Sequence, residues 1–336
     1  MNIKAKYLGI ELKNPVIVGA SNLVTDQDMM KKLEDNGAAA IVYKSLFEEQ
    51  IQLENLEQHS HHEEYGDRHP EMQSMFPNMP DAGPEEFLNR LRKAKEAAGI
   101  PIIASLNCVF EETWVEYAKK IQQTGVDALE LNFYAIPKEF DVMGRAHSQE
   151  QMDIMERIVK NVEIPVSVKL SPYYTNILYV VSEMSKRGAD GFVLFNRLFQ
   201  PDIDTEKEKH HFPYNLSHEE DNRLALRFSG LIYGRIDADV CASNGVFTGN
   251  DVVKMLLAGA DVVQVVSTIY KNGPKQLSKI IKELEQWMEK KGYDSLDDFR
   301  GKLSKKSLND PFTYKRAQYV DILMRSEEIF RKYPII

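Results

Sequence analysis

Polar side chains recur in this sequence where short apolar segments end. They are Ser21, Asn22, Lys44, Ser45, Asn107, Asn132, Lys169, Asn196, Ser243, Asn244 and Ser267. If the apolar segments are parallel strands of a barrel, the polar residues at their carboxyl ends all face one mouth, however far apart they lie in the sequence. One such residue could simply cap a helix, but so many at successive strand ends predict a binding site for a small molecule.

Two lysines and three asparagines in this set indicate the chemistry of that molecule. A charged side chain beside buried apolar sequence costs several kcal/mol unless it is paired, so Lys44 and Lys169 favour an anionic or electron-rich ligand. Asn107, Asn132 and Asn196 each offer donors and acceptors, which suits a planar heterocycle with alternating carbonyl and N–H edges. Neither residue type is a strong general base, because asparagine does not titrate and lysine is normally protonated.

A phosphate group is expected near the end of the predicted barrel. Residues 241–267, CASNGVFTGNDVVKMLLAGADVVQVVS, contain a small-residue turn, a helix start and a second small-residue strand end. Backbone N–H groups of such turns and helix starts bind phosphate, and barrels commonly carry that site after strands seven and eight. The pattern would suit any phosphorylated ligand.

Four histidines, His59, His61, His62 and His69, lie together in a segment rich in glutamate. They lack the helical i, i+4 spacing and the supporting carboxylate that are typical of zinc sites. We therefore expect solvated loop residues here and predict no metal site.

The elements that would position the polar residues alternate between apolar β-type runs and amphipathic helical runs. The expected strands are Pro15–Ala20, Ala39–Lys44, Ile102–Leu106, Ala128–Asn132, Val166–Leu170, Gly191–Phe195, Asp239–Ala242 and Val262–Val266. The expected helices are Asp26–Asn36, Glu85–Ala98, Thr113–Thr124, Gln149–Val162, Asn176–Arg187, Asn222–Tyr233, Gly249–Ala258 and Pro274–Lys291. Eight such repeats predict an α/β protein, a (β/α)8 TIM barrel with long loops at its C-terminal face.

We expect one domain over residues 1–336, with residues 293–336 as a C-terminal helical extension outside the barrel. Glycine follows several expected helices, where a helix C-cap favours a left-handed residue, and no linker rich in proline or serine interrupts the chain. Two long polar segments follow the second and sixth strands, at 48–83 and 197–221. Each is either a lid over the barrel mouth or a decorative insertion.

The composition excludes several classes of function. A formal net charge of −9 argues against a nucleic-acid-binding surface, which needs clustered Lys and Arg in excess. The two cysteines, Cys108 and Cys241, are too few for a disulfide framework, a cysteine-ligated iron–sulfur cluster or a CxxC zinc site within the chain. The first residues lack the apolar core of a secretory signal, and no run reaches membrane-spanning length. We predict a cytoplasmic protein that binds neither nucleic acid nor membrane.

Seven segments of the chain resemble one family. They are NPVIVGAS, IVYKSLF, DALELNFYAIP, PVSVKLSP, VLFNR, SNGVFTGNDVVKMLLAGADVVQVVS and IIKELEQWMEKKGYDSLDDFRGKL. In this order they resemble the dihydroorotate dehydrogenases, particularly the soluble class 1 enzymes, and the related barrel of dihydropyrimidine dehydrogenase. The resemblance covers nearly the whole chain and implies an FMN cofactor.

Carried over residue by residue, the resemblance implies two sets of contacts. Those to FMN are Ala20, Ser21, Lys44, Ser45, Asn107, Asn132, Lys169, Asn244, Gly245 and Ser267, of which the last three hold the phosphate. Those to the substrate are Lys44, Asn78, Asn132 and Asn196. The family usually has two glycines and a Gly-Thr pair where this chain has Asn244–Gly245 and Val266–Ser267. Its MGLPN-like segment appears as MFPN, which keeps Asn78 and loses the glycine.

The chain departs from the family at the general base. The family pattern is close to LNLSCPN, and its cysteine is the base. This chain reads LNFYAIP, with Ala135 at the cysteine position and Pro137 at the position of a substrate-binding asparagine. Losing a general base typically costs about 10²–10⁴-fold in rate. The alternative replacements are Tyr134 and a histidine of the long segment after the sixth strand, His210 or His211.

The first hypothesis is therefore an FMN-dependent oxidoreductase, in which hydride passes from a reduced ring to flavin N5 while a base removes the neighbouring proton. Dihydroorotate is the expected substrate, which would place the enzyme in pyrimidine biosynthesis, and another dihydropyrimidine or a small cyclic acid is the runner-up. A flavin-binding barrel without dehydrogenase activity is an alternative that Ala135 favours. A flavin-free lyase or synthase acting on a sugar phosphate is a third. The resemblance implies a homodimer, and the electron acceptor would be a soluble molecule or a partner subunit.

Overall fold

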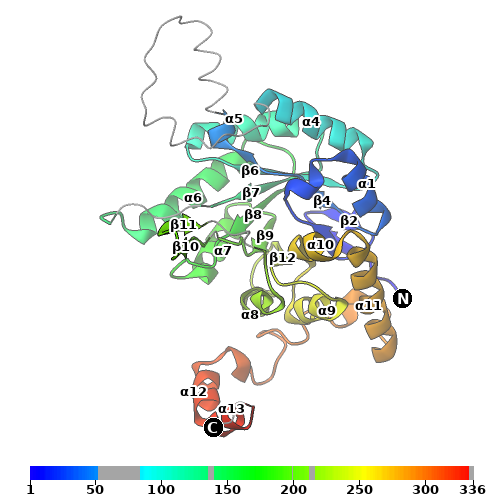
Figure 1. The fold of residues 1–336 in the computed structure, drawn as a ribbon, viewed down its shortest axis with the longest axis vertical. Helices are drawn as coiled ribbons and strands as arrows, with labels where there is room; N and C mark the ends of the chain where they lie inside the picture. Colours follow the sequence, from blue (N-terminus) through cyan, green and yellow to red (C-terminus); the bar gives the residue numbers. More distant parts are fainter. Residues whose placement is uncertain (52–83, 135–139, 199, 212–215, 333–336) are drawn as a thin grey trace, which may run out of the picture.

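A closed parallel sheet forms the centre of the protein, as Figure 1 shows for the computed structural model. The structure describes residues 1–51, 84–134, 140–198, 200–211 and 216–332. Within these residues the sheet has nine strand segments in the order β4-β3-β13-β12-β9-β8-β7-β6-β5, and β4 also pairs with β6. Because β4 (Ile41–Val42) and β5 (Leu46–Phe47) both pair with β6, they are two parts of one strand, and the barrel is eight-stranded.

The barrel strands lie at the predicted positions. Besides β4 and β5, they are β3 (Val16–Val18), β6 (Ile102–Asn107), β7 (Ala128–Asn132), β8 (Val166–Leu170), β9 (Gly191–Leu194), β12 (Asp239–Ser243) and β13 (Val262–Val265). The bounds of β7 and β8 are as predicted, and the remaining strands differ at their ends. The strands are almost continuously buried, because one face lines the barrel interior and the other packs against helices. The predicted α/β TIM barrel is confirmed.

Helices cover the outside of the sheet (Figure 1). They are α1 (Gln27–Asp35), α4 (Pro84–Ala97), α5 (Glu111–Gln122), α6 (Gly144–Val159), α7 (Ile177–Lys186), α8 (Arg223–Ile232), α9 (Gly249–Ala258), α10 (Ser267–Asn272) and α11 (Lys275–Lys291). Short 3-10 helices lie at Asn22–Val24, Glu219–Asn222, Leu296–Asp298 and Phe312–Tyr314. The eight predicted helices are present, although α6 begins earlier than predicted. Its first residues, GRAHS, include no large apolar side chain, so the sequence pattern did not reveal them as helix. The additional helix α10 begins at Ser267, which the sequence pattern places at a strand end.

Aspartates close the amino-terminal end of the barrel. Asp127, Asp190 and Asp261 each directly precede a strand and accept a hydrogen bond of 2.7–2.8 Å from an amide at the start of the preceding strand. An antiparallel hairpin of β1 (Ala5–Tyr7) and β2 (Ile10–Leu12) packs at this end, and its turn donates an amide hydrogen bond to the start of β12. The sequence pattern does not predict this hairpin, because three residues per strand carry too little alternation.

The C-terminal segment is only partly helical. Residues 299–311 form turns, and three of their amides donate hydrogen bonds to carbonyls of α8 and α9. Two helices follow, α12 (Arg316–Met324) and α13 (Ser326–Lys332), and they lie away from the barrel in Figure 1. The expectation of helix over 293–336 is therefore wrong for its first half, where glycine, serine and proline interrupt any helical run. The single-domain organisation stays a prediction.

The structure describes most of the long polar segment after β9 but little of the one after β5. The segment after β9 contains an exposed hairpin in which β10 (Asp202–Asp204) pairs antiparallel with β11 (Lys209–His211). Residues 52–83 of the other segment lie outside the described residues, and so do the four histidines named above. Among the described residues, no helix has the length and apolar character needed to cross a membrane.

Candidate active site

A cavity of about 160 Å³ lies at the carboxyl ends of β3, β8, β9, β12 and β13. Its lining includes six predicted site residues, Ala20, Lys169, Asn196, Asn244, Gly245 and Ser267. It also includes residues that were not predicted, among them Arg197, Leu216, Ser217 and Gln264. Pockets for whole small-molecule ligands usually measure roughly 300–1,000 Å³, so this cavity accommodates one part of a larger ligand.

A larger hollow of about 520 Å³ lies at the opposite end of the barrel. Its carboxylates include Asp190, Asp239 and Asp261, which already accept amide hydrogen bonds from neighbouring segments. Burial raises the pKa of Asp261 to about 6, against the lowering effect of Arg300. Barrel enzymes keep their active sites at the carboxyl ends of the strands, where the polar strand ends lie in this protein. The smaller cavity is therefore the candidate site.

Three predicted asparagines meet in the barrel mouth. The Nδ2 atom of Asn107 donates to the carbonyl oxygen of Asn132 at 2.8 Å, and Nδ2 of Asn196 donates to the side-chain oxygen of Asn132. Asn107 is buried, and the other two are half-buried. Each asparagine amide has two N–H donors and an oxygen with two lone pairs. The three asparagines therefore retain donors and acceptors for the carbonyl and N–H edges of a ring.

Lys169 lies beside a carboxylate of the chain itself. Its Nζ is 3.6 Å from Oε1 of Glu130 on β7 and 3.3 Å from Oε1 of Gln264 on β13. Nε2 of Gln264 in turn donates to Oε2 of Glu130 at 2.6 Å. Glu130 therefore supplies an opposite charge that the sequence did not predict, so Lys169 does not depend on an anionic ligand, and its expected contact with an electron-rich ring stays a prediction.

Glu130 and Gln264 were missed because they lie inside strands rather than at strand ends. Both are buried, with exposed fractions of 1% and 2%. A signal was present, since ALELN and VVQVV each place one polar residue in an apolar strand, and such a residue needs a partner. Glu130 also precedes Asn132 by two positions, which puts both on the inner face of β7.

The predicted phosphate turn has a left-handed backbone. Asn244 has φ 72° and Gly245 has φ 65°. Asparagine is one of the few residues besides glycine that adopt this conformation readily, which explains how it can replace the first glycine of the family pattern. Glycine is required at the second position, because a Cβ on Gly245 would lie 2.5 Å from the backbone nitrogen of Asn222.

Ser217 connects the two strand ends of this predicted phosphate site. Its hydroxyl accepts the N–H of Gly245 at 3.3 Å, and its own N–H donates to Oγ of Ser267 at 2.8 Å. Nζ of Lys271 donates to the carbonyl oxygen of Ser217 at 2.9 Å. Ser217 was missed because it lies in a long polar segment whose sequence carries no periodic pattern.

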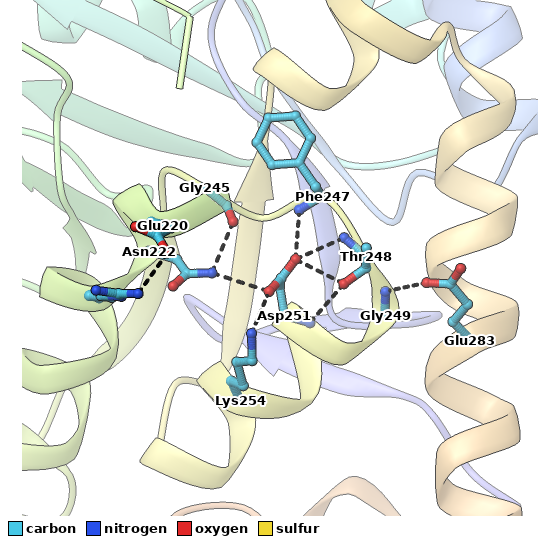
Figure 2. Close-up of polar contacts among 10 residues, drawn as sticks. Glu220, Asn222, Gly245, Phe247, Thr248, Gly249, Asp251, Lys254 and Glu283 are labelled. Carbon is cyan, nitrogen blue, oxygen red and sulfur yellow. Dashed lines mark hydrogen bonds and ion pairs between the residues drawn. The ribbon is translucent and has the colours of Figure 1, made fainter. Parts of the chain in front are cut away.

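The buried carboxylate of Asp251 is hydrogen-bonded to the residues that follow the turn, as Figure 2 shows. Oδ2 of Asp251 accepts hydrogen bonds from the amides of Phe247 and Thr248 and from the Thr248 hydroxyl. Oδ1 accepts from Nδ2 of Asn222 and from Nζ of Lys254. Burial on its own raises the pKa of Asp251, but the hydrogen bonds from Lys254, Thr248 and Phe247 outweigh it and lower that pKa. The turn is therefore fixed by side chains of the protein itself.

The remaining predicted flavin contacts lie near the ends of β3 and β4. The hydroxyl of Ser21 is buried and has no hydrogen-bond partner among the described residues. Ala20 and Lys44 are half-buried. Ser45 is buried, and its hydroxyl lies 2.7 Å from that of Ser105 on β6. Ser21 is thus the residue of this group with an unused polar atom.

Tyr134 is the candidate base nearest in the chain to the asparagine group. It lies two residues after the end of β7, is half-buried, and donates its backbone N–H to the carbonyl oxygen of Asn132 at 3.0 Å. His210 and His211 lie on the exposed strand β11. Three positions of interest lie outside the described residues: Asn78, Ala135 and Pro137. In the described part of the chain, no group of three or more His, Cys, Asp or Glu is arranged to hold a metal.

Comparison with known proteins decides the family. The sequence model of the family described as dihydroorotate dehydrogenase matches residues 2–288. The chain belongs to the dihydroorotate dehydrogenase family. This membership places it among oxidoreductases that act on CH–CH bonds of small molecules, and proteins of this family generally bind a flavin.

Individual relatives are similar over most of their length. The catalytic subunit of dihydroorotate dehydrogenase B (NAD(+)) from Methanocaldococcus jannaschii is 26% identical over 301 residues, covering 85% of this chain and 94% of that protein. The corresponding subunit from Thermoplasma acidophilum is 27% identical over 312 residues, covering 89% and 98%. Dihydroorotate dehydrogenase A (fumarate) from Lactobacillus helveticus is 25% identical over 318 residues, covering 90% and 99%. The family predicted from the sequence is confirmed, whereas the acceptors in these names differ.

Proposed function

We propose that this member of the dihydroorotate dehydrogenase family is an FMN-dependent enzyme that takes hydride from a dihydropyrimidine, with dihydroorotate as the expected substrate. One observation carries the proposal. A left-handed turn at Asn244–Gly245 lies in the same barrel mouth as Lys169 and three asparagines. Such a turn suits a phosphate and such a polar set suits a planar ring, and FMN carries both.

The unused polar atoms of the mouth fit FMN. The buried Ser21 hydroxyl has no hydrogen-bond partner among the described residues, so a ligand that accepts its hydrogen would satisfy it. Oγ of Ser267 accepts the N–H of Ser217 and keeps its own hydrogen, which it can donate to a phosphate oxygen. Lys169 lines the cavity and carries a positive charge that suits an electron-rich ring.

The site residues divide between FMN and the substrate in this proposal, and Lys44 and Asn132 contact both. The phosphate is held by Asn244, Gly245 and Ser267, and the rest of FMN by Ala20, Ser21, Lys44, Ser45, Asn107, Asn132 and Lys169. When bound, FMN would supply the acceptor for the hydride. Lys169 stabilises negative charge that develops beside it, and the substrate ring is oriented by Lys44, Asn78, Asn132 and Asn196.

Proton removal is the step in which this chain must differ from its family. Ala135 has no group that accepts a proton. Tyr134 is the first candidate for the base because it lies two residues after Asn132 and donates its backbone N–H to that residue, and His210 or His211 is the second. The alanine also favours a second candidate function, a flavin-binding barrel that has lost dehydrogenation.

Anaerobic mixing of the FMN-loaded protein with dihydroorotate tests the proposal. The visible absorption band of the flavin should bleach as hydride is transferred. If the band persists for many minutes while dithionite bleaches it readily, dihydroorotate is not the substrate. The same measurement with other dihydropyrimidines and small cyclic acids tests the runner-up, and a band that none of them bleaches supports the second candidate function.

The electron acceptor in this proposal is a soluble molecule or a partner subunit. Support comes from the names of the similar proteins, which specify NAD(+) or fumarate and, for the B enzymes, a catalytic subunit. Mixing the reduced protein with each acceptor and following reoxidation distinguishes them. A homodimer and a cytoplasmic location belong to the same proposal, and light scattering of the purified protein tests the dimer.

A further inference from the structure

The carboxylate of Glu130 lies in the barrel interior next to Lys169, and the roles assigned above do not use it. Its Oε1 is 3.6 Å from Nζ of Lys169, and its Oε2 accepts the 2.6 Å hydrogen bond from Gln264. Because Gln264 also accepts a hydrogen bond from Lys169 at 3.3 Å, the three side chains form a closed triangle across β7, β8 and β13. The lysine is therefore restrained from two directions.

We propose that Glu130 is a positioning residue that sets the direction of the Lys169 ammonium toward FMN and the net charge that FMN experiences. This inference rests on the proposed function, in which FMN occupies the mouth beside Lys169. An ammonium has three N–H donors. One donates to Gln264, and the charge of Glu130 holds the ammonium at 3.6 Å without a hydrogen bond, which leaves donors for the cavity that Lys169 lines.

Stability gives no separate reason for this ion pair. A buried ion pair can often be replaced by apolar residues of similar volume without loss of stability, and Oε1 of Glu130 makes no hydrogen bond among the described residues. Its compensation is the charge of Lys169. Burial, reinforced by the charge of Glu130, also raises the pKa of the neighbouring Cys241, so that thiol stays neutral and does not compete for the lysine.

Replacing Glu130 with glutamine removes the charge and keeps the size of the side chain. The uncompensated Lys169 should then stabilise the reduced, more negative flavin, and the midpoint potential of bound FMN should rise. We expect at least a tenfold shift in the reduction equilibrium, which is about 30 mV for a two-electron couple. Potentials are measured by equilibration with a reference dye. E130D, which retains the charge, should shift the equilibrium less than E130Q.

Ser167→Ala is the matched control. Ser167 is buried and pairs in register with Glu130 across β7 and β8, and its hydroxyl bonds to the carbonyl oxygen of Leu129. Its loss disturbs the same layer without removing a partner of Lys169. The potential should stay at the wild-type value in S167A. An E130Q potential that matches S167A would overturn the inference.

A stability measurement keeps the inference testable if E130Q does not fold. In K169M the carboxylate is left unpaired, so the melting temperature should fall, and adding E130Q to K169M should raise it again. A double variant no more stable than K169M would overturn the pairing. If the wild-type protein binds no FMN, the proposed function fails, while this comparison still tests Glu130 and Lys169.

Discussion

Replacing Asp251 with asparagine should loosen the turn that is proposed to hold the FMN phosphate. The carboxylate accepts five hydrogen bonds, which tie Phe247 and Thr248 at the end of the turn to α9 and to Asn222 (Figure 2). Asparagine has nearly the same shape but keeps one oxygen and presents an NH2 group in place of the other. Whichever way the amide is turned, its NH2 group then faces N–H or O–H donors of the neighbouring residues instead of acceptors.

The loss of stability in D251N can be estimated from those contacts. With the oxygen of the amide kept toward Phe247 and Thr248, the NH2 group faces Asn222 and Lys254. Lys254 is 46% exposed and can turn to water, whereas Asn222 is buried and loses an acceptor. A hydrogen bond to a charged group is worth roughly 1.5–3 kcal/mol, so we expect a total loss of about 2–4 kcal/mol. For an unfolding entropy of about 2.1 cal/mol/K per residue, the melting temperature should fall by about 3–6 °C.

Thermal unfolding followed by circular dichroism measures this loss, and quenching of FMN fluorescence measures the affinity of the turn for its ligand. We expect FMN affinity to fall at least about tenfold, since each 1.4 kcal/mol corresponds to a factor of ten. Lys254→Ala is the control, because an exposed ion pair is worth roughly 0–1 kcal/mol. Equal melting temperatures and equal FMN affinities in D251N and K254A would refute the reasoning.

The phosphate turn, a buried aspartate and the candidate base can each be tested by a single substitution. Gly245→Ala should reduce FMN affinity at least about tenfold in a fluorescence titration, because a left-handed residue with a Cβ costs roughly 1–2 kcal/mol and this Cβ would lie 2.5 Å from a backbone nitrogen. Asp261 has a pKa raised to about 6, so the native protein binds more protons than the unfolded chain between about pH 4 and pH 6, and stability falls as the pH rises through that window. In thermal melts Asp261→Asn should therefore match the wild type near pH 4 and exceed it above pH 6, by at most about 3 kcal/mol. Tyr134→Phe should slow anaerobic flavin reduction by about 10²–10⁴-fold if the phenol is the base.

A control variant or a contradicting result accompanies each of the three substitutions G245A, D261N and Y134F. Asn244→Gly keeps the left-handed turn and its backbone N–H groups and loses only the side-chain hydrogen bond to the carbonyl oxygen of Phe195, so it should lose less FMN affinity than G245A; equal losses in the two variants would contradict the role given to the turn. A stability difference between D261N and the wild type that does not change with pH would contradict the raised pKa. Undiminished flavin reduction in Y134F would exclude Tyr134 and direct attention to His210 and His211.

The sequence predicts the parts of this protein that carry a repeated pattern. The bounds of β7 and β8 follow from apolar runs that end in Asn132 and Lys169, because a buried parallel strand must be apolar until it reaches the mouth. The polar strand ends then identify the mouth. The partners of Lys169 were not predicted, because Glu130 lies within the apolar run of the neighbouring strand β7 and Gln264 reaches both side chains from β13 across the barrel, which no local pattern specifies.

Other parts could not be predicted for related reasons. Ser217 joins the two halves of the predicted phosphate site from a segment without periodicity. The hairpin of β1 and β2 has strands too short to show alternation. The replacement of two glycines by Asn244–Gly245 becomes clear only from the backbone angles, which show that asparagine adopts the required conformation. In each case the deciding interaction is tertiary.

The central claim is that this barrel mouth binds FMN. The most direct test is to purify the protein, denature it, and identify any released chromophore by chromatography against FMN, FAD and riboflavin standards. We expect a yellow protein that releases FMN, one molecule per chain. A colourless protein that releases no FMN, and does not quench the fluorescence of added FMN, would contradict it.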